Sequence, residues 1–313
     1  DMLNHKMAAL RKFQERELDD TQKIQVDLDL LKTVNAYENP QQTPWLPSTV
    51  EIVTRVANEF IQRHSDEPEP ASQASYVQIR AEALGRDPSS ITDGDLTEDI
   101  ERLTAIHDKY PGTAGALFAL MDVLEMIKDR DGLGSEAMAT MVQKLKSGYA
   151  DHPGLRQMAY KLQPYVLAVE GLPEFTVTDL SGKEWNSRNL GGGVILFDFW
   201  ATWCAPCLQE LPNLIQLYSM YKDRGFQILG ISLDEQQKIS EDDLKKWIKE
   251  NNITWPIVYS GQGWSTTGVH ECGATAGIPF PILVGRDGKV ITAAEGATGQ
   301  NLAKELAKLF GES

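Results

Sequence analysis

An apolar run that leads directly into two closely spaced cysteines limits what this chain can fold into. In the segment VILFDFWATWCAPCLQELP, the run Val194–Phe199 predicts a buried strand, and the cysteines open the helix that follows. Cys204 would lie at the N-terminus of that helix, where unpaired N–H groups and the helix dipole favour a thiolate. Cys207 lies one turn further on, close enough to form a disulfide with Cys204. The spacing predicts dithiol–disulfide exchange without an added cofactor: Cys204 attacks a substrate disulfide, and Cys207 resolves the mixed disulfide.

Composition argues against several other classes of protein. The 313 residues suffice for two domains, and 42% hydrophobic with 24% charged residues is typical of globular proteins. The net charge of −15 argues against nucleic-acid binding, and no apolar run reaches the roughly 18 residues of a membrane span. Three cysteines are too few for a disulfide-stapled scaffold. The first residue is Asp1, which fits the loss of a signal peptide or an anchor as well as it fits an arbitrary boundary.

Residues 1–170 predict an all-α domain, because apolar side chains recur at helical spacing. Three prolines spaced 43 and 42 residues apart introduce similar segments: Pro68, Pro111 and Pro153. This period fits helix-pair repeats of the tetratricopeptide-like or HEAT-like kind, and a non-repetitive helical bundle is the alternative. In either form we expect the helices to bind a protein partner or to mediate oligomers.

Residues 171–313 predict an α/β domain with a largely parallel central sheet, because short apolar or β-branched runs alternate with helical patterns. The Asp287-Gly288 turn predicts an antiparallel hairpin for the last two strands. The expected strands are Phe175–Thr178, Val194–Phe199, Phe226–Ile231, Ile257–Tyr259, Ile282–Val284 and Val290–Thr292. The expected helices are Ala205–Lys222, Glu241–Asn251 and Asn301–Phe310.

The segment Trp203-Cys204-Ala205-Pro206-Cys207 after a strand resembles the active site of the thioredoxin fold. From about Leu172 to Ser313, the sequence resembles the TlpA/ResA branch of bacterial exported thiol–disulfide proteins, notably in LPEFTVTDLSGKEW, GISLDE and GIPFPILVGRDGKV. The resemblance implies a mixed central sheet flanked by helices and an enzyme that reduces disulfides of exported proteins. It also implies an upstream electron donor and a periplasmic or otherwise exported location, although a cytoplasmic one stays open.

The resemblance assigns roles to three residues around the cysteine pair. Pro279 matches the cis-proline that faces the cysteines and presents backbone to a substrate chain. The next two residues, Phe280-Pro281, differ from the threonines usual in the family, which puts the pairing of the strand after Pro279 in question. Asp198 matches a buried acid with a raised pKa that relays a proton for Cys207; a solvated acid at the strand end is the alternative. Glu210 matches an acid that tunes or deprotonates Cys207, with a solvated helix residue as the alternative.

Five residues near the cysteines are candidates for substrate contact: Trp203, Ala205, Pro206, Ile278 and Trp264. Trp203 is expected to shape the reactive surface, whereas Trp200 is expected in the core. Trp264 lies in the Gly- and Ser-rich loop SGQGWSTTG and fits either substrate contact or the lid of a small aromatic cluster.

The third thiol, Cys272, has three interpretations. It fits a buried small hydrophobe near the substrate groove or an auxiliary redox thiol. With His270, Cys204 and Cys207 it also offers ligands for zinc or copper. Because redox chemistry already explains the cysteine pair, we expect no metal and no cofactor beyond the Cys204–Cys207 disulfide.

Other functions remain open on this sequence. A disulfide isomerase or oxidase would share the same fold and cysteine pair, and a helical scaffold with a vestigial redox domain is a further alternative. A peroxiredoxin is disfavoured. Its Pro-x-x-x-Thr-x-x-Cys pattern, aligned on Cys204, requires a proline where this chain has Phe197 and a threonine where it has Ala201.

Overall fold

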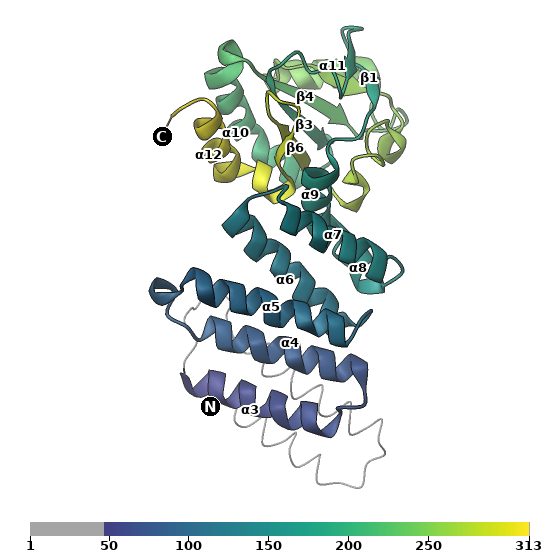
Figure 1. Ribbon diagram of the computed structural model, residues 1–313. Coiled ribbons are helices and arrows are strands. Elements are labelled where there is room, and N and C mark those ends of the chain that lie inside the picture. The colour runs from purple at the N-terminus through teal and green to yellow at the C-terminus, as the bar shows by residue number, and fades with distance from the viewer. Residues whose placement is uncertain (1–46, 313) are drawn as a thin grey trace. The chain divides into compact units, whose positions relative to one another are not determined.

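The computed structural model describes residues 47–312, which form two compact units (Figure 1). The first contains the described residues up to Gly132 and Thr140–Leu155; the second contains Leu133–Ala139 and continues from Arg156. The expected boundary at 170/171 follows the change from helices to strands, whereas the compact units divide at 155/156. The difference arises because helix α9 (Ala159–Glu170) packs against the sheet of the second unit.

The first unit is helical, and its core comes from the apolar stripes that the sequence predicts. Leu117, Leu120 and Leu124 lie in one helix and are completely buried. The expected helices in residues 1–46 lie outside the described residues, and the helix-pair repeat stays a prediction. The α-helices between residues 47 and 157 are α3 (Pro47–Arg63), α4 (Pro68–Leu84), α5 (Asp93–Lys109), α6 (Ala114–Asp131), α7 (Glu136–Tyr149) and α8 (Pro153–Gln157), of which α7 and α8 each extend into the second unit at one end.

The second unit is built on a five-stranded sheet in the order β5-β4-β3-β6-β7. The first three of these strands are parallel to one another. β6 runs antiparallel to both of its neighbours, β3 and β7, so the sheet is mixed. β1 (Thr176–Thr178) and β2 (Glu184–Asn186) form a separate antiparallel pair, of which the sequence pattern predicts only β1. The strands of the sheet are β3 (Val194–Trp200), β4 (Phe226–Ser232), β5 (Ile257–Tyr259), β6 (Phe280–Val284) and β7 (Val290–Ala293).

Helices and a central strand give this unit its core. All seven residues of β3 are buried, because the strand has neighbours on both sides. The hairpin expected at Asp287-Gly288 joins β6 to β7, and Gly288 takes the positive φ of 78° that such a turn favours. The helices that follow β3, β4 and β7 are α10 (Ala205–Tyr221), α11 (Glu241–Glu250) and α12 (Gly299–Leu309).

The unusual Phe280-Pro281 pair does not disturb the strand that contains it. β6 keeps a regular antiparallel register with β3, in which Phe280 lies opposite Phe199 and Pro281 opposite Asp198. On its other side β6 pairs with β7 only from Ile282 onward. Pro281 therefore lies where one side of the strand has no partner, a position at which a missing N–H is tolerated.

None of the helices in residues 47–312 combines the length and the apolar character that crossing a bilayer requires.

Candidate active site

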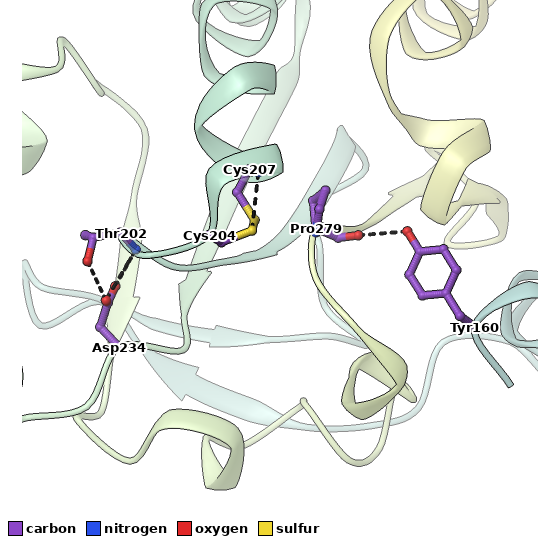
Figure 2. Close-up of a disulfide and its surroundings, with 6 residues drawn as sticks. All are labelled: Tyr160, Thr202, Cys204, Cys207, Asp234 and Pro279. Carbon is purple, nitrogen blue, oxygen red and sulfur yellow. Dashed lines mark hydrogen bonds between the residues drawn. A yellow bond between two sulfur atoms is a disulfide. The ribbon is translucent and has the colours of Figure 1, made fainter. Parts of the chain in front are cut away.

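The two cysteines form a disulfide at the N-terminus of α10 (Figure 2). Their sulfur atoms are 2.05 Å apart, and Cys204 is the N-cap residue of the helix. The Cys207 N–H donates a hydrogen bond to Cys204 Sγ over 3.3 Å. Because this N–H is one of the donors that a helix terminus leaves unpaired, it would also stabilise negative charge on Cys204 Sγ after reduction.

The proline after Ile278 lies at the same edge of the sheet as the disulfide. The Ile278–Pro279 peptide bond is cis, as the family resemblance implies. Because Phe280 pairs with Phe199, Pro279 lies beside the carboxyl end of β3, from which the chain leads to Cys204 (Figure 2). Within residues 47–312, the backbone N–H and C=O of Ile278 form no hydrogen bond. They are therefore available to an incoming peptide chain.

A buried carboxylate that sequence reasoning missed anchors the loop before Cys204. Asp234 accepts hydrogen bonds from the Thr202 N–H (3.1 Å) and the Thr202 hydroxyl (2.6 Å), as Figure 2 shows. The Ser232 hydroxyl donates a further hydrogen bond of 2.8 Å. The available signal was the motif GISLDE, whose polar residues end β4 next to the end of the parallel strand β3.

We expect the Asp234→Asn substitution to lower the free energy of unfolding by about 2 kcal/mol. An asparagine amide would direct N–H groups at donors that now point to the carboxylate, which leaves buried groups unpaired. Urea unfolding of the oxidised chain measures the change. Asp287→Asn is the matched control, because this exposed turn residue precedes a glycine and asparagine suits the same turn. Equal stability of the Asp234→Asn variant and the wild type would contradict the anchoring role.

Asp198 is buried in the centre of the sheet. On β3 it lies between Gly230 of β4 and Pro281 of β6, so the alternative of a solvated acid at the strand end does not hold. Burial, and to a smaller extent the negative charge of Glu210, raises the pKa of the Asp198 carboxyl to about 7. A carboxyl with this pKa can accept or release a proton near neutral pH.

Glu210 links α10 to the start of α12. One of its carboxylate oxygens accepts a hydrogen bond of 2.7 Å from the Gly299 N–H and one of 2.5 Å from the Asn213 amide. Gly299 is the first residue of α12, where a carboxylate favourably caps a free N–H. Glu210 is therefore not a solvated helix residue, and its charge acts on Asp198.

The candidate substrate-contact residues divide by exposure. The Trp203 side chain is 49% exposed and that of Trp264 is 37% exposed, and their ring centroids are 6.2 Å apart. Ala205 and Pro206 are also exposed, and Ile278 is half-buried. Trp200 is buried and packs on Trp247, as expected for a core residue. The two exposed indoles thus provide an apolar surface next to Cys204.

Cys272 is completely buried in the core of the second unit. Burial raises the pKa of its thiol to about 12, which keeps it protonated at neutral pH. His270 is exposed, and in the described part of the chain no three His, Cys, Asp or Glu side chains are grouped as metal ligands would be. The burial favours the interpretation of Cys272 as a small core residue.

Known proteins resemble this unit of the chain. The profile of the AhpC/TSA family matches residues 170–302. The thiol-disulfide oxidoreductase ResA of Bacillus thuringiensis subsp. konkukian is 33% identical over 142 residues, which cover 44% of this chain and 75% of that protein. The chain belongs to the ResA family of thiol-disulfide oxidoreductases. A ResA from Bacillus cereus is 34% identical over 119 residues, which cover 38% of this chain and 64% of that protein.

A solved structure is also similar. The thioredoxin domain of a thiol-disulfide oxidoreductase from Bacteroides vulgatus is 32% identical, with a TM-score of 0.39, and the match covers 44% of this chain and 94% of that one. Membership of the ResA family confirms the predicted thioredoxin-like oxidoreductase domain, which follows a helical N-terminal region. The AhpC/TSA match begins at residue 170, the last residue of α9, so the rest of α9 and the helices before it lie upstream of the matched region.

Proposed function

We propose that this member of the ResA family reduces disulfide bonds of exported proteins through the dithiol pair Cys204 and Cys207. One observation carries the proposal: the disulfide lies at a helix N-terminus, at the same edge of the sheet as the cis bond before Pro279 and the unpaired backbone of Ile278. This arrangement offers a sulfur nucleophile and a backbone strip for a substrate chain at one edge.

The reaction is two successive thiol–disulfide exchanges. The Cys204 thiolate attacks one sulfur of the substrate disulfide, the substrate S–S bond breaks, and the other substrate sulfur leaves as a thiolate and takes up a proton. Cys207 then loses its proton and attacks Cys204 Sγ. The Cys204–Cys207 disulfide forms and the second substrate thiolate leaves. The substrate gains two electrons, which an upstream dithiol donor must return to the chain, so no further cofactor is needed.

The proton of Cys207 needs an acceptor before the second exchange. Asp198 is the group proposed for this role, because its pKa of about 7 leaves an appreciable deprotonated fraction at neutral pH. Glu210 raises this pKa by its charge and is proposed to tune the acceptor. Trp203, Trp264 and the first-turn residues Ala205 and Pro206 are proposed to contact the substrate, because all four are exposed beside the disulfide.

The resemblance to exported thiol–disulfide proteins supports a periplasmic or otherwise exported location. For the helical unit we propose a protein partner, since helical arrays present extended surfaces for peptides or proteins.

A redox titration of the Cys204–Cys207 pair against glutathione tests the direction of the reaction. For a reductase we expect a potential nearer to about −270 mV, the value typical of thioredoxin, than to about −120 mV, that of a strong oxidant. The reduced chain should also reduce insulin disulfides rapidly while turning over hydrogen peroxide slowly or not at all. A potential at the oxidising end of this range would replace the reductase by an oxidase or an isomerase.

A further inference from the structure

Helix α9 holds the loop that carries the cis-proline, through a hydrogen bond that no sequence pattern indicates. The Tyr160 hydroxyl donates to the carbonyl oxygen of Pro279 over 2.9 Å (Figure 2). The Tyr160 ring also packs edge-on against Phe280, with ring centroids 5.6 Å apart. The two residues that follow Ile278 in the chain are thus both contacted by the Tyr160 side chain.

A second residue of α9 extends this contact along the same loop. A Cβ atom built on Gly273 would come within 2.4 Å of the Gln163 side chain, so Gln163 fills the space beside that glycine. Gln163 follows Tyr160 by three residues and therefore lies on the same face of the helix. A Cβ atom on Gly277 would meet the Tyr160 ring at 3.7 Å. The loop from Gly273 to Pro279 is thus covered by α9 at several points.

The loop needs such an external support because it has little regular secondary structure of its own. Between Gly273 and β6 its regular structure is the single 3₁₀ turn η4 (Ala274–Ala276), and both flanking glycines take positive φ values, 73° at Gly273 and 150° at Gly277. Glycines with this freedom lose more conformational entropy when a substrate orders them than other residues do. A support that orders the loop in advance lowers this cost of binding.

Tyr160 is suited to act as a permanent donor. Burial, and to a smaller extent the negative charge of Glu295, raises the pKa of its hydroxyl, so the O–H remains protonated over the working pH range. The residue lies upstream of residue 170, where the match to the AhpC/TSA family begins. The contact is therefore supplied by a helix that precedes the matched domain.

We propose that Tyr160 is a positioning residue for substrate binding: it fixes the carbonyl of Pro279 and thereby presents the free backbone of Ile278 to the substrate chain. This rests on the proposed function, in which the backbone of Ile278 pairs with a protein substrate. A small aromatic disulfide does not need this backbone strip. Tyr160 should therefore affect reactions with protein disulfides and leave those with small disulfides unchanged.

The test compares Tyr160→Phe with wild type in the full chain, using insulin and a small aromatic disulfide as substrates. Phenylalanine keeps the ring contact with Phe280 and removes only the hydroxyl. We expect KM for insulin to rise about three- to ten-fold, which corresponds to the loss of one hydrogen bond, and kcat to stay unchanged. The rate with the small disulfide should equal that of wild type.

Tyr259→Phe is the matched control. The Tyr259 hydroxyl also donates to a backbone carbonyl of the second unit, that of Ile239 over 2.6 Å, but not to the cis-proline loop. An unchanged KM in Tyr160→Phe, an equal rise in Tyr259→Phe, or an equal loss with the small disulfide would each overturn the positioning role. A wild-type chain that reduces neither substrate would instead overturn the proposed function.

Discussion

Replacing Cys204 by serine is expected to lower the rate of disulfide reduction by about 10³-fold or more, to the uncatalysed background. The Cys204 sulfur forms the first bond to substrate, and a serine hydroxyl neither ionises near neutral pH nor exchanges with disulfides. The measurement is insulin reduction by the full chain with an excess of a chemical dithiol, corrected for reduction by the dithiol alone. Residual activity of Cys204→Ser above one-tenth of wild type would contradict the assignment of Cys204 as nucleophile.

Cys207→Ala provides the companion experiment, because it leaves the first exchange intact and removes the second. Mixed disulfides should then accumulate through Cys204 and be detectable by non-reducing electrophoresis and mass spectrometry. The same variant, expressed in the native compartment, would capture the physiological substrates. A Cys207→Ala chain that forms no adducts through Cys204 would contradict these roles of the two cysteines.

Cys272→Ala is the matched control for both cysteine variants. The Cys272 thiol is completely buried and its pKa is raised to about 12, so it offers neither access nor a thiolate. We expect insulin reduction by this variant to match that of wild type. Adducts through Cys272 in the Cys207→Ala chain would show that the core opens to substrate.

The sequence predicts most of the second unit because its local signals agree with its tertiary environment. The run Ile257–Tyr259 is predicted as a strand and forms β5 with the same bounds, since it is apolar and lies between turn residues. The Asp287-Gly288 turn fixes the last hairpin in the same way. The cis bond before Pro279 followed from a family resemblance and not from any local pattern.

Contacts between residues far apart in the chain were not predictable. Tyr160 and Pro279 are 119 residues apart, and the helical pattern around Tyr160 does not differ from that of the preceding helices. For this reason the sequence places α9 in the all-α domain, whereas its side chains pack in the second unit. Asp234 was missed because a polar residue after a strand usually faces solvent, and only the register of β3 and β4 brings it beneath Thr202.

The pH dependence of stability gives a direct test of Asp198. Burial raises the pKa of this carboxyl from about 4 in the unfolded chain to about 7 in the folded chain, so between these values the folded chain binds more protons than the unfolded chain. The stability that protonation contributes is complete below about pH 4 and is lost as the pH rises through about 7. Asparagine is neutral at every pH and removes this slope.

We therefore expect the oxidised Asp198→Asn variant to be more stable than oxidised wild type at pH 8, by up to about 4 kcal/mol. The difference should shrink as the pH falls toward 4, because wild-type Asp198 is then protonated in both states. Urea unfolding at several pH values measures both curves. A wild-type curve without this slope, or a destabilised variant at pH 8, would contradict a raised pKa at this position.

Glu210→Gln separates the two causes of the raised pKa. Removing the charge of Glu210 should lower the folded-state pKa of Asp198, so the loss of stability should end at a lower pH than in wild type, while burial keeps part of the slope.

If Asp198 also accepts the proton of Cys207, the rate of the resolution step should depend on pH in the same way as the stability does in each of the three chains. Measured in single turnover, its rate in wild type should rise through about pH 7, the rise should move to lower pH in Glu210→Gln, and it should disappear in Asp198→Asn. A Glu210→Gln chain in which the pH dependence of stability shifts but that of the resolution rate does not would give a different result. This result would agree with a raised pKa of Asp198 and would contradict its role as the acceptor of the Cys207 proton.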